Sequence, residues 1–204
     1  MPDAARVSTP VSTIDRLYPW RGAAPADLEL ACTQIARRLI ASGKRAIGFV
    51  PAAGTGDLLP LLVRLAAALF PFQQRQAAVI PDWPTWDAAP PDTRRLGADE
   101  HGPTLRPLAG EAGPTLLVPP PCPDGDTAAL SLQLAVRRLE KKFPQALIDL
   151  SGFAGRDASE IASASRLVDG VAVVATSGRT SVALLKRAAQ VAPAEKNLGA
   201  LLIG

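Results

Sequence analysis

Residues 46–62 constrain the fold of this chain more than any other stretch. They join an apolar run, a small glycine-containing loop and a helical pattern. The apolar run ends at Val50, Gly54 and Gly56 lie in the loop, and the helical pattern begins at Asp57. In a phosphate-binding loop the same order of strand, loop and helix turns backbone N–H groups and a helix N-terminus toward an anion. The stretch therefore has the layout of a nucleotide site.

The residues at the end of this loop contradict its layout. A phosphate-binding loop needs a lysine for the phosphates and then a Ser or Thr hydroxyl for magnesium. Here those positions hold Asp57 and Leu58. A unit charge pair at ~4 Å is worth roughly 4 kcal/mol at an effective dielectric of 20, so repulsion in place of attraction shifts the interaction by about twice that before screening. We expect no tight, magnesium-dependent ATP binding, although weak anion binding by the N–H groups of Gly54 and Gly56 stays open.

Composition limits the classes of protein. The chain has 204 residues, of which 48% are hydrophobic and 20% charged, enough for one globular domain with a good core. A net charge of +3 is too small to predict nucleic-acid binding alone. No apolar run approaches the ~20 residues of a membrane span, and no signal peptide is visible, so we expect a cytoplasmic protein. Cys32 and Cys122 lack metal-ligand spacing and are expected to be reduced thiols, with no metal site.

Hydrophobic periodicity predicts an N-terminal arm over residues 1–25 and one α/β domain over residues 26–204. Helices are expected over 27–42, 57–70, 127–142, 157–165 and 180–191, and strands over 45–50, 77–80, 115–118, 146–150, 170–175 and 198–203. Residues 81–113 are rich in proline, glycine and charge, and are expected to be irregular. Alternating strands and helices indicate a mostly parallel sheet covered on both faces, a three-layer α/β/α architecture.

Two helices have a predicted buried face. In the helix over 27–42 that face holds the apolar residues Leu28, Ala31, Ile35, Leu39 and Ile40. In the helix over 127–142 the apolar residues Leu130, Leu134, Val136 and Leu139 are expected inside, and the basic residues Arg137, Arg138, Lys141 and Lys142 outside. The basic stripe is either a solvated helix face or a surface for acidic lipid or an acidic partner.

Ligands of such folds bind at the carboxyl ends of the strands, which here are expected at 51–57, 81–82, 151–155 and 176–180. At these four ends the chain resembles the ParA/MinD-type P-loop ATPases. Within that superfamily it is most similar to bacterial tyrosine kinases and regulators of capsule or exopolysaccharide chain length. The similarity covers about residues 27–204 and is carried by the order of the segments 53–58, 79–84, 116–121, 142–152, 168–180 and 198–204. The segment 168–180, for example, resembles the family's D-G-V-x-L-V-V-x-x-G-x-T.

The resemblance implies a P-loop NTPase fold with a degenerate phosphate loop formed by Ala53, Gly54, Thr55, Gly56, Asp57 and Leu58. Asp82 and Asp149 match the acidic positions that hold magnesium in the family. Asp149 has an equally plain alternative role as a cap or hydrogen-bond acceptor. The kinases of the family carry a tyrosine cluster as their own substrate, whereas the single tyrosine here is Tyr18.

Other residues are candidates for contact with a partner. Trp83 and Trp86 flank a proline in the irregular stretch, and would either meet a partner or fold back over the sheet edge. Arg179 would either meet an anion or lie on the surface beside a helix start. His101 and Cys122 are the members of a conceivable nucleophile pair, with a solvated histidine and a packed thiol as the alternative.

The sequence-based hypothesis is a bacterial pseudo-ATPase or pseudokinase without catalytic residues or cofactor. It would act as a scaffold or regulator of exopolysaccharide or capsule synthesis or export, by protein–protein interaction. The expected partner is an active ParA/MinD-type or tyrosine-kinase-type homologue, in a homo- or heterodimer, or a membrane polysaccharide-export protein that holds the chain at the inner membrane. One alternative is an ATPase or autophosphorylating tyrosine kinase that holds magnesium and ATP with Asp82 and Asp149. The other is a MinD/ParA-like positioning or division factor.

Overall fold

The computed structural model describes residues 26–52, 55, 57–82, 106–108, 115–117, 127–154 and 158–203. Within these residues a single seven-stranded sheet has the order β3-β4-β2-β5-β1-β6-β7. The strands are β1 (Ala46–Pro51), β2 (Ala78–Ile80), β3 (Arg106–Leu108), β4 (Thr115–Leu117), β5 (Ala146–Asp149), β6 (Gly170–Thr176) and β7 (Asn197–Ile203). All neighbours pair in parallel except β3, which is antiparallel to β4.

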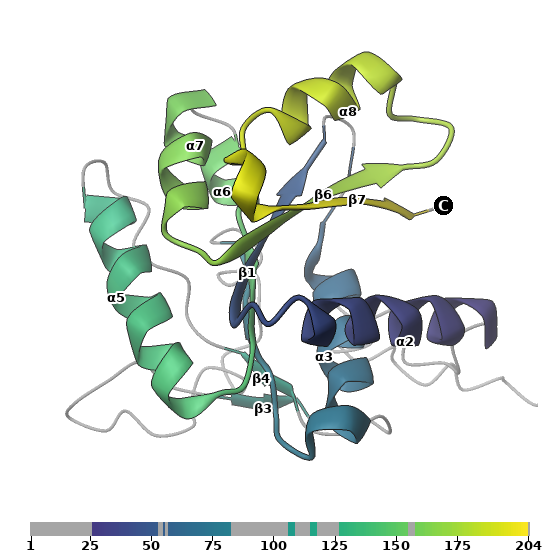
Figure 1. The fold of residues 1–204 in the computed structure, drawn as a ribbon, viewed down its shortest axis with the longest axis vertical. Coiled ribbons are helices and arrows are strands. Elements are labelled where there is room, and N and C mark those ends of the chain that lie inside the picture. The colour runs from purple at the N-terminus through teal and green to yellow at the C-terminus, as the bar shows by residue number, and fades with distance from the viewer. Residues whose placement is uncertain are drawn as a thin grey trace, which may run out of the picture.

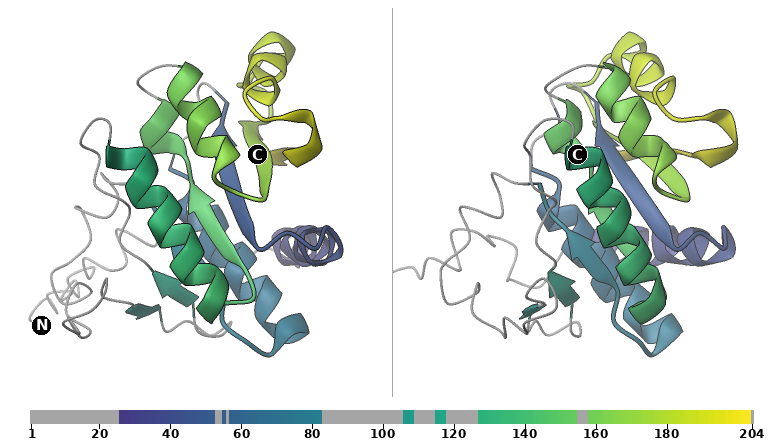
Figure 2. Two further views of the ribbon diagram at one scale, coloured as in Figure 1. Left: turned by 60° about the vertical axis from the view of Figure 1, so that its left-hand side comes forward. Right: turned by 90° about the vertical axis from the view of Figure 1, so that its left-hand side faces the viewer.

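Helices cover both faces of this sheet, as Figures 1 and 2 show. They are α2 (Ala26–Ala41), α3 (Leu59–Gln73), α5 (Thr127–Lys142), α6 (Ser151–Ala154), α7 (Ala158–Arg166) and α8 (Val182–Ala189), with a 3-10 turn η2 (Ala194–Lys196) before β7. The buried side chains of α2 and α3 pack against one face, and those of α5 and α7 pack against the other. The predicted three-layer α/β/α architecture is confirmed.

The strand β6 shows why the core has two halves. All but the last of its residues are buried, and successive side chains point to opposite faces of the sheet. Ala172 and Val174 belong to the cluster with α2 and α3. Val171 packs in the cluster with α5 and α7, while Val173 and Ala175 pack against α8. A strand that is apolar at every position is what a sheet covered on both faces requires.

Three elements differ from the sequence-based expectation. β3 lies within the stretch expected to be irregular, and it is an edge strand, the place where a sheet tolerates a residue such as Pro107. α6 follows β5 directly, in a segment expected to be a loop. α3 begins at Leu59 rather than Asp57. It continues through Pro71 to Gln73, past the expected end at Phe70.

The buried faces of two helices were predicted only in part. In α2 the buried residues are Cys32, Ala36 and Leu39. Of the predicted ones, Leu39 is thus confirmed, Leu28 and Ala31 are exposed, and Ile35 and Ile40 are partly buried. The N-terminal half of α2 extends past the edge of the sheet in Figure 1, so its apolar side chains have less to pack against. Cys32 is a free thiol and its pKa is raised by burial. Cys122 lies outside the described residues.

In α5 the core stripe is rotated from the predicted one. Leu132 is fully buried, together with Val136 and Leu139, whereas Leu130 is 56% exposed and Leu134 is 47% exposed. The spacing of four and three residues in the observed stripe fits a helix as well as the predicted one did. The four basic residues of the stripe over 137–142 are exposed as expected. No helix in the described part of the chain is long and apolar enough to cross a membrane.

Leu132 and Leu130 provide a matched test of this register. We expect Leu132→Ala to lower the free energy of unfolding by about 2–5 kcal/mol, because it leaves a cavity in the core. Leu130→Ala makes the same chemical change in the same helix at an exposed position, and should cost less than about 0.5 kcal/mol. Urea denaturation of both variants measures the difference, and equal losses would contradict the observed face.

Candidate functional site

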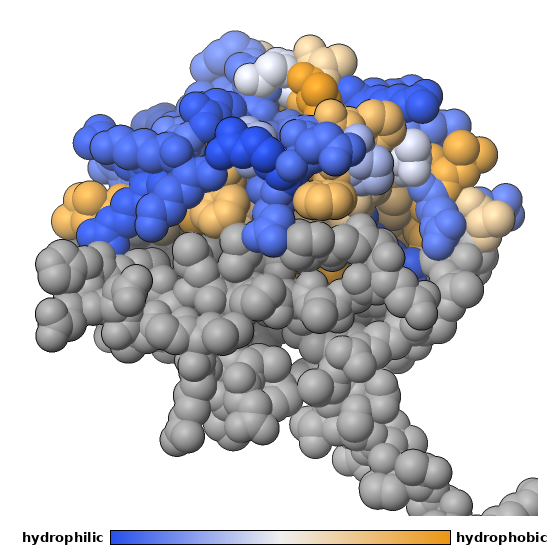
Figure 3. Space-filling model, turned by 90° about the horizontal axis from the view of Figure 1, so that it is seen from below, coloured by the Kyte–Doolittle hydropathy of each residue, from blue (hydrophilic) through white to orange (hydrophobic). Residues whose placement is uncertain are grey.

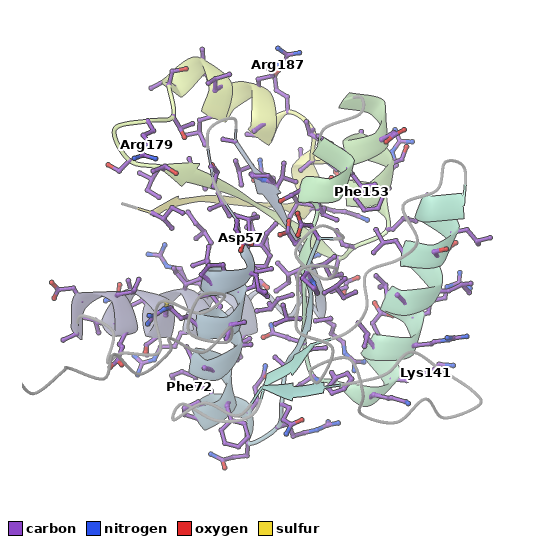
Figure 4. All side chains as sticks on the ribbon, turned by 180° about the vertical axis from the view of Figure 1, so that it is seen from behind. Asp57, Phe72, Lys141, Phe153, Arg179 and Arg187 are labelled. Carbon is purple, nitrogen blue, oxygen red and sulfur yellow. The ribbon has the colours of Figure 1, made fainter. Side chains whose placement is uncertain are left out.

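Three acidic residues meet at the carboxyl edge of the sheet. The strands β2, β5 and β1 are adjacent, and their chains continue into Asp82, Asp149 and Asp57 respectively. Both Asp82 and Asp57 raise the pKa of Asp149 by charge repulsion, so the three carboxylates lie close enough to influence one another. The sequence placed these residues at or beside the carboxyl ends of strands, and the structure makes those strands neighbours. Figure 4 shows Asp57 beside the first turn of α3.

The carboxylate of Asp57 is bound to the helix that follows it. Its Oδ1 accepts a hydrogen bond of 2.9 Å from the backbone N–H of Leu59, the first residue of α3. The first N–H groups of a helix have no partner within the helix, and they attract negative charge. Pro60, in the same turn, has no N–H to offer. Asp57 therefore supplies an anion to the start of α3 from within the chain.

The pKa of Asp57 is raised, first by desolvation and further by the negative charge of Asp82, while the bond from Leu59 opposes the shift. The residue as a whole is exposed, so water screens these effects and the shift has little bearing on stability. The direction of the shift shows that negative charge is disfavoured at this position, chiefly because the carboxylate is desolvated and to a smaller extent because Asp82 is near.

Leu58 and Thr55, close to Asp57 in the sequence, make contacts within the folded domain. Leu58 is fully buried in the cluster that α2 and α3 form against the sheet. Thr55 donates its N–H to the Ala52 carbonyl at 3.0 Å, and its hydroxyl donates to the Val174 carbonyl at 3.1 Å. These bonds hold Thr55 against the carboxyl end of β6. Ala53, Gly54 and Gly56 lie outside the described residues.

Asp149 is buried and capped by its neighbour. It is 4% exposed, and its Oδ1 accepts hydrogen bonds from the N–H of Ser151, at 2.8 Å, and from the Ser151 hydroxyl. Burial raises the pKa of Asp149 to about 7, against the lowering effect of the two bonds from Ser151. Asp149 binds the start of α6 through an N–H two residues ahead, as Asp57 does at α3. The structure thus gives Asp149 the capping role that the sequence left open.

The remaining candidate residues either lie away from the three acids or fall outside the described residues. Arg179 is exposed on the turn after β6, and Figure 4 shows it out to one side of Asp57. Its N–H donates to the Thr176 carbonyl at 3.2 Å. Trp83, Trp86, His101 and Cys122 lie outside the described residues. Among the residues that are described, no group of three or more His, Cys, Asp or Glu side chains has an arrangement that could hold a metal ion.

Sequence reasoning missed the structural role of two residues. Asp169 was noted within the motif over 168–180, and its Oδ2 accepts the N–H groups of Arg45, at 3.0 Å, and Ala46, at 2.9 Å. It therefore joins the start of β1 to the start of β6. Ser151 holds the Asp149 carboxylate. The signal available for Ser151 was a hydroxyl residue two positions after an acid at a strand end, a common capping arrangement.

Comparison with solved structures supports the fold. A BceF tyrosine kinase domain matches with a TM-score of 0.58 and 15% identity over 87% of this chain and 76% of its own. A crystal structure of the chimerical protein CapA2B2 matches with a TM-score of 0.61 and 12% identity, over 93% of this chain and 88% of its own. The kinase domain of the Escherichia coli tyrosine kinase ETK matches with a TM-score of 0.59 and 11% identity, over 87% of this chain and 74% of its own. No protein-family model and no curated protein matches the chain. The chain has the α/β P-loop fold of bacterial tyrosine kinase domains.

The raised pKa of Asp149 predicts a pH dependence of stability. The folded value is about 7 and the ordinary value is 3.8. Unfolding therefore releases a proton between these pH values, and the Asp149 contribution to stability, fully present below about pH 4, is lost as the pH rises through 7. At about 1.4 kcal/mol per pKa unit, the loss is on the order of 4 kcal/mol.

Asp149→Asn keeps an oxygen acceptor for Ser151 and removes the titration. We expect its free energy of unfolding, measured in urea from pH 4 to pH 8, to rise relative to the parent chain as the pH increases. A difference between the two proteins that does not change with pH would contradict the burial of a titrating carboxyl group.

Proposed function

We propose that this chain is a non-catalytic scaffold or regulator with a degenerate phosphate-binding loop. It acts by protein–protein interaction in the synthesis or export of an exopolysaccharide or capsule. The observation that carries the proposal is the hydrogen bond from the Leu59 N–H to the Asp57 carboxylate. In a working phosphate loop the helix N-terminus receives a phosphate of the nucleotide. Here a side chain of the loop itself is the anion at that position.

Electrostatics adds to this occupation of the helix start. A nucleotide triphosphate placed in the loop would meet Asp57 in the position of the family's lysine, with Asp82 and Asp149 close by. Each of these groups would repel the phosphates when ionised. The effective dielectric of a protein surface leaves such repulsion at several kcal/mol per close pair, roughly 4 kcal/mol at 4 Å before ionic screening.

The residues at the positions of the family's magnesium ligands are also poorly suited to bind magnesium. The position of the family's Ser or Thr holds Leu58, whose side chain is part of the core and has no oxygen. Asp149 already accepts two hydrogen bonds from Ser151. Burial raises the pKa of Asp149 to about 7, so magnesium binding at neutral pH would also have to release a proton from part of the molecules.

The pathway and the partner are inferred from the family resemblance and from the shared fold. Two of the solved chains of similar fold are described as tyrosine kinase domains. We infer a partner that is an active kinase-type or ParA/MinD-type homologue, in a homo- or heterodimer, or a membrane protein of polysaccharide export. A chain that keeps the fold and gives up the nucleotide can still present the loops of its carboxyl edge to such a partner.

An active enzyme is the alternative that one observation favours. Asp82 and Asp149 share the carboxyl edge, and Asp149 has a strongly shifted pKa, as acids in active sites often do. In that case the two carboxylates would hold magnesium, and ATP binding would require both the metal and Asp149. The two proposals therefore give opposite results in one binding experiment.

We expect ATP, with or without magnesium, to leave the melting temperature of the parent chain unchanged. Asp57→Lys restores the positive charge, and Asp57→Asn is its control because it keeps the oxygen that caps Leu59. The lysine variant should bind ATP at least roughly tenfold more tightly than the asparagine variant in calorimetry. Magnesium-dependent stabilisation of the parent chain by ATP, abolished by Asp149→Asn, would instead establish the enzyme.

The partner is tested in the native host. After crosslinking in cells, affinity capture of the parent chain and mass spectrometry should recover proteins of polysaccharide synthesis or export. The Asp57→Asn variant should recover them equally, since the proposed contacts need no nucleotide. Recovery of chromosome-segregation or septum proteins instead would contradict the assigned pathway and favour a positioning factor.

A further inference from the structure

A cluster of basic side chains lies at the end of the molecule opposite the three acids. We name it the basic face and define it by Lys44, Arg45, Arg75, Arg138, Lys141 and Lys142. All are exposed except Lys44, which is partly exposed. They come from the start of β1, the connection between α3 and β2, and the last turns of α5. Figure 3 views this end of the molecule, and in its coloured part hydrophilic side chains predominate, with hydrophobic ones between them.

Hydrogen bonds join the three segments of the basic face. The Arg45 guanidinium donates to the carbonyl oxygens of Glu140 and Phe143, the second at 3.0 Å. The Arg75 guanidinium donates to the Lys142 carbonyl at 2.9 Å. Beneath them the buried Gln145 side chain donates to the Lys44 carbonyl at 3.0 Å. The face is therefore a fixed arrangement of charges rather than a set of independent side chains.

The charges of this face are directed to solvent. The acceptors of Arg45 and Arg75 are backbone carbonyls, which carry no formal charge. Arg138, Lys141 and Lys142 lie at spacings of three and four residues on one side of α5 and project together. Two acidic residues lie beside these bases and are partly exposed: Glu140, between them in α5, and Asp169, whose carboxylate accepts the N–H of Arg45. The face thus has a strong excess of positive charge.

An exposed aromatic residue lies at the same end. Phe72, near the end of α3, is 42% exposed, and the Arg37 guanidinium lies 5.3 Å from the centre of its ring. Figure 4 shows Phe72 and Lys141 at the same end of the molecule, on its two sides. Interfacial membrane-binding surfaces combine basic residues with apolar ones such as Phe, which enter the boundary between headgroups and acyl chains.

We propose that the basic face binds directly to a bilayer of anionic phospholipids. Clusters of four to eight basic residues bind such surfaces, at about 1 kcal/mol for each Lys or Arg near the headgroups. The face spans three elements across one end of the domain, which suits a broad charged plane. With this end at the bilayer, the carboxyl edge with Asp57 and Asp149 points away from the membrane. Peripheral attachment then needs no membrane-spanning partner.

Vesicle flotation tests the proposal on the full chain. Vesicles of phosphatidylcholine with a quarter of phosphatidylglycerol should bind the protein at about 0.1 M salt, and binding should fall steeply at about 0.5 M. Pure phosphatidylcholine vesicles should not bind it. The triple variant R138Q/K141Q/K142Q should lower the partition onto the anionic vesicles by roughly 100-fold, since three contacts of about 1 kcal/mol are lost.

The control is the triple variant R179Q/K186Q/R187Q, at the other end of the molecule. It removes the same charge, and Lys186 and Arg187 lie in the last turn of α8 as Lys141 and Lys142 do in α5. Its binding should match that of the parent chain, and circular dichroism should show both variants folded. Equal losses in the two triples would overturn the proposal. So would binding to duplex DNA or polyglutamate that is as tight as binding to the anionic vesicles.

Discussion

The central position of β1 in a parallel sheet determines where the acids of the carboxyl edge and the bases that precede the strands lie. β1 pairs with β5 on one side and with β6 on the other, in registers that set Phe49 against both Asp149 and Ala172. The close packing depends on Gly48, where a Cβ atom would lie 2.6 Å from the Leu150 side chain. Because the strands run the same way, the residues that follow them meet at one edge and those that precede them at the other. The acids after β1, β2 and β5 therefore gather at one end, and bases before the same strands at the opposite end.

The carboxylates of Asp57 and Asp149 each accept the first N–H of the helix that follows them, which gives the proposed loss of nucleotide binding a structural basis. A helix that starts at a phosphate loop has N–H groups that need an acceptor. A side-chain hydrogen bond to such an N–H contributes about 1 kcal/mol and is present in every molecule, whatever the ligand concentration. Asp57 supplies this acceptor at α3, and Asp149 does the same at α6. The acid that contradicts the phosphate chemistry is thus consistent with the local folding of the chain, and Leu58 contributes through its burial in the core.

The sequence predicted most of the fold because its strands and helices have clear periodicity and its strand ends carry recognisable motifs. It also predicted that Asp57, Asp82 and Asp149 would share one edge, since that follows from parallel strands. It could not choose between Leu130 and Leu132, because both spacings fit a helix and only the position of α5 on the sheet decides. The raised pKa of Asp149 could not be predicted from the sequence either, because it depends on burial that leaves only 4% of the residue exposed. The hydrogen bonds that Asp57 and Asp149 accept could be identified only once the geometry of the two turns was known.

The separation of charge gives the two proposals a common physical basis while leaving them independent. The three acids of the carboxyl edge and the basic face lie at opposite ends of the sheet, and a negatively charged surface would attract the domain with its basic face inward. That orientation presents the carboxyl edge to partners, whether or not a nucleotide binds there. The loop chemistry concerns repulsion over a few ångströms around Asp57, whereas lipid attraction acts over about a Debye length at the far end. A protein whose nucleotide loop proved functional could therefore still bind lipid, and one that ignored lipid could still be a scaffold.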